Sequence, residues 1–168
     1  MPPILRPARA EDVPAIQSIY GYHVQHGTGT FELEPPSLGT MQSRFTQLVS
    51  RDFPFLVATE DDTVIGFGYA GPFRERPAYR FTVEDSIYLH PEKLGRGTGR
   101  LLLQRLIEEA TQREFTQMIA VIGDSDNRAS IRVHAAAGFR TTGTLQNVGF
   151  KFDRWLDVVL MQRPLGNS

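Results

Sequence analysis

The sequence predicts an α/β fold of the α+β kind, with a mixed central sheet of about seven strands flanked by four helices. Two amphipathic segments precede the first hairpin, a glycine-rich turn joins a strand to a third amphipathic segment, and two β-rich runs come last. The chain has 168 residues, of which 40% are hydrophobic and 22% charged. We therefore expect one domain spanning residues 1–168.

The first elements are a strand and two helices. Residues 4–8 are β-rich, and the acidic residues 11–12 open a helix that fades near residues 27–29. The apolar residues of this helix are Val13, Ile16, Ile19 and Tyr20. After a double-proline connector, Ser37 is expected to cap a second helix. Its apolar face is predicted to carry Leu38, Met41, Phe45, Leu48 and Val49.

A hairpin and a long strand follow. Residues 55–59 and 64–70 read as antiparallel strands joined by an acidic turn. Gly66 and Gly68 suggest a bulge or a close approach of another segment. A polar stretch then leads to a strand over residues 80–90, which Pro91 closes.

The second half begins with a crossover. Residues 100–112 form an amphipathic helix and residues 118–122 an apolar strand, so this strand and the one before the helix are predicted to be parallel. Another helix spans residues 128–137 and ends at Gly138. Two final strands are expected at 142–145 and 155–161, connected through 147–153.

Composition excludes several classes of function. The formal net charge is -1 and the basic residues are scattered, which argues against a dedicated nucleic-acid or membrane-surface binder. The chain contains no cysteine, so thiolate metal sites and cysteine acyl-enzymes are excluded. No apolar run approaches the ~20 residues that span a bilayer. We expect a cytoplasmic protein with a small-molecule partner.

The turn Leu94-Gly-Arg-Gly-Thr-Gly99 is typical of an anion site, because backbone N–H groups and the helix dipole there favour negative charge. A P-loop is excluded because no Gly-Lys-Ser/Thr follows. A dinucleotide fingerprint is disfavoured because Arg100 stands where a small residue is needed for close helix packing. A nest of amides from Gly95 to Arg100 remains, and the alternative is a flexible loop that merely begins a helix.

This turn resembles the Q/R-x-x-G-x-G/A signature of the GNAT acetyltransferase superfamily, with Leu94 departing at the first position. Segments 30–32, 70–73, 82–84, 120–123 and 149–151 resemble the phosphinothricin and methionine-sulfone N-acetyltransferase subgroup. The resemblance runs from about Leu5 to Leu165. It implies the fold of that superfamily, acetyl-CoA as co-substrate and a homodimer.

The resemblance also implies where the coenzyme binds. Asn127, Ser130 and His134 share one stripe of a helix, which in the superfamily borders the pantetheine arm. The expected cofactor-binding residues are Ile87, Tyr88, Leu89, Gly95, Arg96, Gly97, Thr98, Gly99, Arg100, Asn127 and Ser130. No metal is predicted, since the other histidines lack ligand-like spacing.

Acyl transfer to an amine needs a base, and strand periodicity puts Arg80, Thr82 and Glu84 on one face. That face could equally meet solvent. The resemblance implies that Glu84 is the base, and Asp85 on the opposite face is the reserve candidate. His134 stands where the superfamily has a tyrosine, and an imidazolium there could protonate the leaving thiolate. The alternative is a histidine that simply packs in the core.

The acceptor site is predicted from arginine chemistry and the family pattern, because bidentate arginine suits a carboxylate. Each arginine could instead be a solvated loop charge. The predicted substrate-binding residues are Phe31, Glu32, Arg74, Arg76, Tyr79, Arg80 and Lys151. Trp155 is interpreted as a packing residue.

These observations favour an N-acetyltransferase that moves an acetyl group from acetyl-CoA to the α-amine of a small amino acid or analogue by direct transfer. Phosphinothricin, methionine sulfoximine and methionine sulfone are the expected analogues. The alternatives are acetylation of a protein N-terminus, lysine or polyamine, and a non-catalytic acyl-CoA-binding module. A nicotinamide-dependent enzyme conflicts with Arg100.

Overall fold

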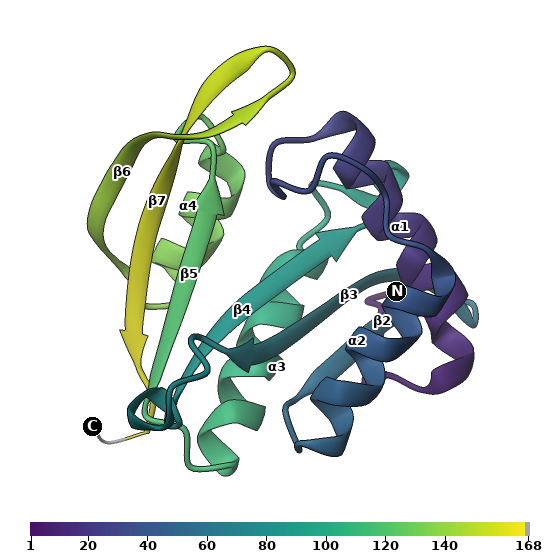
Figure 1. Cartoon of the computed structure of the whole chain (residues 1–168). Coiled ribbons are helices and arrows are strands. Elements are labelled where there is room, and N and C mark those ends of the chain that lie inside the picture. The colour runs from purple at the N-terminus through teal and green to yellow at the C-terminus, as the bar shows by residue number, and fades with distance from the viewer. Residues whose placement is uncertain (167–168) are drawn as a thin grey trace.

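The computed structural model describes residues 1–166, so residues 167 and 168 of the predicted domain lie outside the described part. Seven strands form one sheet in the order β1-β2-β3-β4-β5-β7-β6 (Figure 1). The strands are β1 (Ile4–Pro7), β2 (Phe55–Glu60), β3 (Thr63–Pro72), β4 (Thr82–Leu89), β5 (Gln117–Gly123), β6 (Arg140–Lys151) and β7 (Arg154–Pro164). The four α-helices are α1 (Val13–His26), α2 (Leu38–Ser50), α3 (Thr98–Gln112) and α4 (Arg128–Ala136). The predicted fold class and element order are confirmed.

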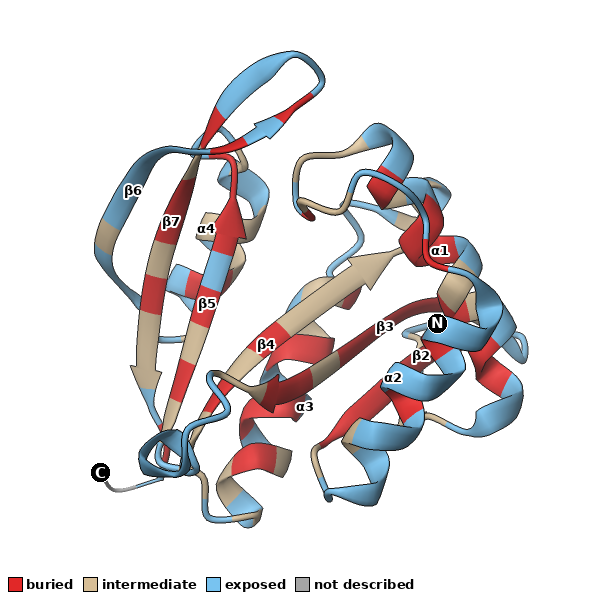
Figure 2. Cartoon of the chain, in the orientation of Figure 1, coloured by how far each residue is buried: buried red, intermediate tan, exposed pale blue. Residues whose placement is uncertain are grey.

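The sheet separates two apolar clusters. The helices α1 and α2 pack on one face, where Val24 of α1 and Phe67 of β3 are almost fully buried. On the other face, Leu102 and Leu106 of α3 lie in a cluster with Met118 of β5 (Figure 2). Because apolar helix stripes cover both faces, side chains that alternate along a central strand reach different environments.

The helix α2 is capped as predicted, since the backbone N–H of Thr40 donates to Ser37 Oγ at 3.1 Å. The predicted apolar face is too wide. Leu38 and Val49 are 40% and 45% exposed, whereas Met41 is buried. Only a narrow stripe of this helix meets the rest of the cluster, so its ends remain in solvent.

The first hairpin is confirmed. Its turn is Asp61-Asp62, with φ of 51° and 62°, as a two-residue turn between twisted strands requires. The register shifts at Ala58, opposite Gly66. A Cβ on Gly66 would also lie 2.6 Å from Leu89 Cδ2, so both the predicted bulge and the predicted close approach are present.

The strand predicted at 80–90 begins later than expected. Pro77 opens a 3-10 turn, and Arg80 donates back to the carbonyl of Pro77 at 3.1 Å. The strand β4 therefore starts at Thr82. Arg80 was wrongly predicted to share a strand face with Thr82 and Glu84. It belongs to the turn, so the side-chain alternation of the strand does not extend to it.

The last hairpin is longer than predicted. The strands β6 and β7 meet at a turn of Phe152 and Asp153, with φ of 53° and 60°. Most of the predicted connection, residues 147–151, instead belongs to β6, which bulges between Leu145 and Gly149. There the N–H of Asn147 donates to Asp157 Oδ1 at 2.9 Å. Trp155 was wrongly interpreted as a packing residue, since it is 64% exposed.

The strands β4 and β5 are parallel, as predicted, but they pair only where Thr82–Glu84 meets Gln117–Ile119. Beyond Glu84 they diverge, while β5 stays paired with β7 along its whole length. The sheet is therefore split at its middle (Figure 1). Such a split exposes strand edges and side chains to any molecule that enters.

The connection between α1 and α2, residues 27–37, forms a bridge across the open end of the split. Thr28 Oγ1 donates to Asp124 Oδ2 at 2.7 Å, and Lys151 Nζ donates to the carbonyl of Thr30 at 2.8 Å. The ring of Phe31 lies against Gly123, where a Cβ would be 2.6 Å from the carbonyl of Thr28. A glycine is needed there because both a backbone atom and a ring fill the space.

Replacing Gly123 with Ala is expected to cost about 1–3 kcal/mol of unfolding free energy, because the added methyl forces the bridge off the end of β5. Urea titration measures this loss. Gly143→Ala is the matched control, since no heavy atom lies within 4 Å of its would-be Cβ. Equal stability of the two variants would contradict the close packing.

Candidate active site

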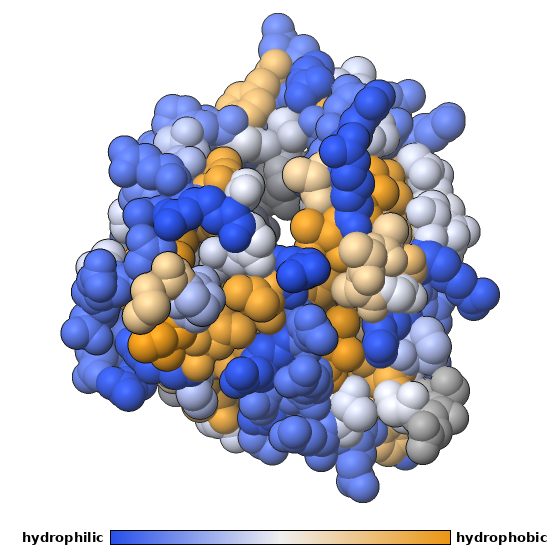
Figure 3. Space-filling view, turned by 180° about the vertical axis from the view of Figure 1, so that it is seen from behind, coloured by the Kyte–Doolittle hydropathy of each residue, from blue (hydrophilic) through white to orange (hydrophobic). Residues whose placement is uncertain are grey.

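The split between β4 and β5 holds a groove of about 450 Å³. Seen from behind, the molecular surface is hollowed near its centre, with hydrophobic side chains beside the hollow (Figure 3). The groove is lined by His23, Gly29, Asp85, Ser86, Ile87, Tyr88, Leu89, Leu94, Gly95, Gly97, Gly99, Arg100, Ala120, Val121, Ile122, Gly123, Asn127, Ala129, Ser130, Val133 and His134. It therefore gathers β4, β5, α4 and the glycine turn around one space.

The glycine turn forms one end of the groove. Gly95 and Gly97 have φ of 73° and 83°, a left-handed backbone that side-chain-bearing residues rarely adopt. Gly97 is the N-cap of α3, which begins at Thr98 rather than at Arg100 as predicted. The first N–H groups of α3 have no partner within the helix, so they form an anion cradle.

Two of the predicted residues in this turn do not line the groove. Thr98 is 2% exposed and packs inward. Arg96 forms an ion pair with Glu60 at 3.4 Å, and Lys93 pairs with the same carboxylate at 3.1 Å. The carboxylate thus fixes the turn from outside, while Arg100 remains exposed at the groove.

The remaining predicted coenzyme contacts all line the groove. Ile87, Tyr88 and Leu89 come from the part of β4 that has left β5. Asn127 caps α4, and its Oδ1 accepts from the N–H of Ser130 at 3.3 Å. This bond fixes the asparagine side chain, so its amide nitrogen is the part left for a ligand.

Glu84 lies where β4 leaves β5, as the last paired residue of its strand. It is on the opposite face of β4 from Val83 and Asp85, both of which are buried. Burial is the main cause that raises its pKa to about 7; the charge of Asp85 contributes to the rise, and Arg74 opposes both. A carboxylate with such a pKa accepts protons efficiently near neutral pH.

His134 and Asp85 form a buried pair on the other face. His134 Nε2 lies 2.8 Å from Asp85 Oδ2, and His134 Nδ1 donates to the carbonyl of Ser130 at 2.7 Å. Burial lowers the pKa of His134, but the hydrogen bond and the charge of Asp85 outweigh burial and raise it. Both ring nitrogens of His134 thus have hydrogen-bond partners, which the sequence did not predict.

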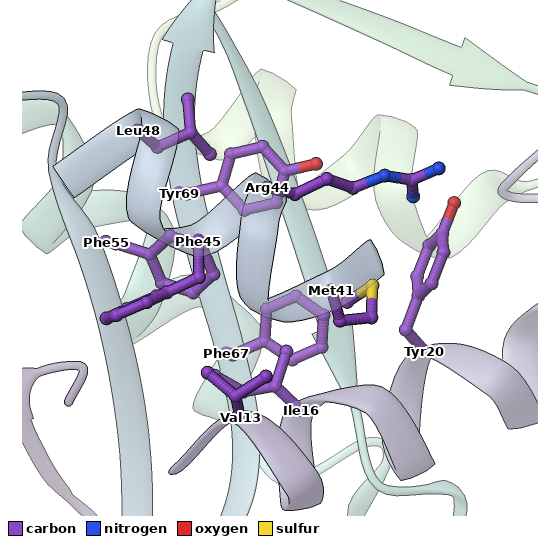
Figure 4. Close-up of a pocket in the computed structure, with 10 residues that line it drawn as sticks. All are labelled: Val13, Ile16, Tyr20, Met41, Arg44, Phe45, Leu48, Phe55, Phe67 and Tyr69. Carbon is purple, nitrogen blue, oxygen red and sulfur yellow. The ribbon is translucent and has the colours of Figure 1, made fainter. Parts of the chain in front are cut away.

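A polar cluster lies beside Glu84 on the α1 and α2 side. Glu32 accepts two hydrogen bonds from Arg44, at 2.7 and 3.0 Å, and one from Tyr20. The guanidinium of Arg44 and the hydroxyls of Tyr20 and Tyr69 lie at the edge of an apolar pocket (Figure 4). The Arg44 hydrogen bonds lower the pKa of Glu32, burial opposes them, and the Tyr20 hydrogen bond lowers the pKa further.

Three residues of this cluster were missed by the sequence analysis. Tyr20 read as a core residue because it falls on the apolar stripe of α1, and Arg44 sits on the polar side of α2. Tyr69 lies in an apolar strand. No spacing between them is regular, because the fold assembles them from three elements.

Predicted acceptor residues fall into two groups. Phe31, Glu32 and Lys151 meet at the bridge, and burial lowers the pKa of Lys151 while the charge of Glu32 opposes this. The others lie on the loop between β3 and β4 and are exposed: Arg74, Arg76, Tyr79 and Arg80. Arg80 lies over the ring of Phe81 at 4.5 Å. Of this group, only Arg74 acts on the pKa of Glu84.

Residues 1–166 contain neither a cluster of metal-ligating side chains nor a helix that could span a membrane. No three histidine, aspartate or glutamate side chains there are grouped so that they could hold a metal ion. Within the same residues, every helix is too short or too polar to cross a bilayer.

Comparison with known proteins agrees with this geometry. Residues 21–139 match the acetyltransferase (GNAT) family. The chain is 48% identical to phosphinothricin N-acetyltransferase from Alcaligenes faecalis, over 96% of this chain and 82% of that protein. It is 37% identical to the L-methionine sulfoximine/L-methionine sulfone acetyltransferase of Salmonella typhimurium, over 96% and 94%.

The fold is matched equally closely. A GNAT superfamily phosphinothricin acetyltransferase from Sinorhizobium meliloti, solved in complex with acetyl-CoA, superposes with a TM-score of 0.97 at 46% identity, covering 100% of this chain and 91% of that one. The split sheet, the amide cradle and these matches together assign the chain to the GNAT family of acetyltransferases.

Proposed function

We propose that this acetyltransferase moves an acetyl group from acetyl-CoA to the α-amine of a small amino acid or analogue, such as phosphinothricin, methionine sulfoximine or methionine sulfone. Transfer is direct, within a ternary complex. The observation that carries the proposal is the state of Glu84. This residue lies beside the end of the groove, and its pKa is raised to about 7. The relatives named for these acceptors support the substrate class.

The co-substrate would lie along the groove. The amide cradle at Gly95–Gly99 and the cation of Arg100 suit the pyrophosphate. The arm would then follow β4 from Leu89 back toward Asp85, between this strand and Asn127 of α4. Its acyl end therefore reaches the place where β4 and β5 begin to pair.

Glu84 acts on the acceptor. The carboxylate takes a proton from the ammonium, directly or through a water, and the neutral amine attacks the thioester carbonyl. The high pKa of Glu84 has its cause in burial, so the same apolar walls that raise it also keep bulk water from the acyl group.

The acceptor carboxylate is proposed to meet the exposed arginines Arg74, Arg76 and Arg80, with Tyr79 beside them. On the opposite side, Phe31 and Glu32 of the bridge and Lys151 of β6 would close the pocket. The cation of Lys151 and the Glu32–Arg44 ion pair, at 2.7 Å, give that wall a fixed electrostatic pattern. Such a pattern discriminates acceptors by charge as well as size.

Replacing Arg100 with Ala is expected to raise the KM for acetyl-CoA about tenfold, because one charge-assisted contact to phosphate is lost. The value of kcat should change little, since the start of α3 that carries Arg100 lies at the Leu89 end of β4, whereas Glu84 lies near the other end of that strand. Arg105→Ala is the matched control, because this exposed arginine pairs with Glu108 on α3 and lies outside the groove. Identical KM values for the two variants would contradict the cradle.

A thiol-release assay tests the proposed function. Acetyl-CoA is incubated with the protein and with phosphinothricin, methionine sulfoximine, methionine sulfone, common amino acids, polyamines or peptides. We expect thiol release with the first three, together with N-acetylated products by mass spectrometry. Release with peptides or polyamines alone would favour the alternative acceptors, and binding of acetyl-CoA without any release would favour a non-catalytic module.

The active form is proposed to be a homodimer in the cytoplasm. Apolar and aromatic side chains are exposed on the β6–β7 hairpin, between 47% and 64% in each case: Leu145, Val148, Phe150, Phe152 and Trp155. Burial of such a patch against a second copy supports association. Light scattering should give twice the chain mass of 18.9 kDa, whereas the single chain mass would contradict the dimer.

A further inference from the structure

Asp85 carries a polar atom that the proposed chemistry has not used. Its side chain is 2% exposed, and its Oδ2 lies 2.8 Å from His134 Nε2. The second oxygen, Oδ1, is buried and has no hydrogen-bond partner among the described residues. Asp85 also lines the groove. A buried carboxylate with an unmet acceptor at a ligand groove points to a role in binding or catalysis.

The protonation of the pair follows from its partners. His134 Nδ1 faces the carbonyl of Ser130, which only accepts, so this nitrogen carries a proton. A carboxylate on Asp85 also only accepts, so Nε2 carries a proton as well. His134 is then an imidazolium whose charge is balanced by Asp85. The groups that face the ring are Asp85 of β4, the carbonyl and hydroxyl of Ser130, and the edge-on ring of Phe139.

We propose that Asp85 is a positioning residue for acyl transfer, which holds the His134 ring in the groove wall with a proton on Nε2. This inference rests on the proposed acetyl transfer. When the thioester breaks, the Nε2–H bond of His134 breaks and the S–H bond of coenzyme A forms. The amine nitrogen loses its second proton to water as the amide forms. His134 becomes neutral while Asp85 keeps its charge, and a proton from the solvent returns to Nε2 as coenzyme A leaves.

The position of Asp85 explains why the two proton transfers stay apart. Glu84 and Asp85 are neighbours on β4, so their side chains leave opposite faces of the strand. Glu84 faces the acceptor side with Tyr69 and Arg74 nearby, whereas Asp85 faces α4. One peptide unit thus separates the group that takes a proton from the pair that gives one.

The second oxygen of Asp85 sets a requirement on the test. Oδ1 is buried without a partner, so removing this oxygen would leave a gap beside the imidazole. A variant must therefore keep an oxygen at this place if packing is to be separated from proton transfer.

Asp85→Asn meets that condition. The asparagine can turn its NH2 group toward Nε2, which then accepts as part of a neutral imidazole, while the Nδ1–H bond to Ser130 remains. The amide oxygen takes the place of Oδ1. Shape and hydrogen bonding are preserved, but His134 is held without its Nε2 proton.

We expect Asp85→Asn to lower kcat about a hundredfold with little change in the KM for acetyl-CoA, as loss of a proton donor requires. The alkaline limb of the kcat–pH profile should move to lower pH, because the pKa of His134 loses the support of Asp85. His134→Gln should show a similar loss, and the double variant should lose little more than either single one.

An NMR titration of the His134 imidazole tests the pair without turnover. The midpoint should lie above the ordinary histidine value in the unchanged protein and below it in Asp85→Asn. Asp12→Asn is the matched control, since Asp12 is also buried in an ion pair, with Arg6 at 2.8 Å, but lies outside the groove.

An unshifted imidazole midpoint in Asp85→Asn overturns the proposal, as does full kcat in that variant when the unchanged protein is active. The proposal is also overturned if the fold-loss of kcat in the double variant equals the product of the losses in the two single variants. Absence of thiol release by the unchanged protein overturns the proposed function instead, and the titration then still decides whether Asp85 keeps the proton on His134 Nε2.

Discussion

Replacing Glu84 with Gln is expected to lower kcat by about 10²–10⁴, because the variant keeps the size of the side chain but cannot accept the proton of the acceptor ammonium. Acetyl-CoA binding should be nearly unchanged, since Glu84 does not line the groove. Steady-state thiol release at pH 7 and calorimetric titration with acetyl-CoA measure the two quantities separately.

Glu75→Gln is the control for this experiment. That carboxylate belongs to the loop after β3 and pairs with Arg51 at 3.2 Å, with both side chains at least half exposed. It should leave kcat unchanged. If Glu84→Gln turned over as fast as the unchanged protein, Glu84 would have no part in proton transfer.

The same substitution is expected to stabilise the protein at high pH by about 1–3 kcal/mol. Folding raises the pKa of Glu84 from its usual 4.5 to about 7, chiefly through burial. A raised pKa means that the folded state holds the proton more tightly. Its contribution to stability is present below pH 4.5 and is lost as the pH rises through 7. Glutamine carries no such penalty.

Urea titrations at pH 4.5 and pH 8 measure this effect. The difference between Glu84→Gln and the unchanged protein should be small at the lower pH and should favour the variant at the higher pH. Equal differences at the two pH values would show that ionised Glu84 is not disfavoured by its surroundings. The expected pattern would mean that the surroundings that raise the pKa of Glu84 also lower the free energy of unfolding above pH 7.

The order of elements was predictable because local signals agree with the final fold. The cap at Ser37, the turn at Asp61-Asp62 and the stop at Gly138 are short-range features, and the structure contains each. The start of β4 and the length of β6 were missed for tertiary reasons. A 3-10 turn at Pro77 and the bond from Asn147 to Asp157 depend on segments that sequence spacing does not connect.

The candidate site divides in the same way. The glycine turn and the α4 stripe could be recognised because each lies within one element and its cap. The pairing of Asp85 with His134 joins residues 49 positions apart, and strand alternation alone gave Asp85 only as a reserve base. The Glu32–Arg44 pair was equally hidden, because it forms only when α2 packs beside the bridge.

The central claim is that Glu84 is the base for amine acetylation, and the pH dependence of kcat/KM for the acceptor tests it most directly. We expect the unchanged protein to lose activity on the acid side with an apparent pKa of about 7, the value that burial gives Glu84. The residual activity of Glu84→Gln should lack this acid limb. An acid limb that persists unchanged in Glu84→Gln would contradict the account.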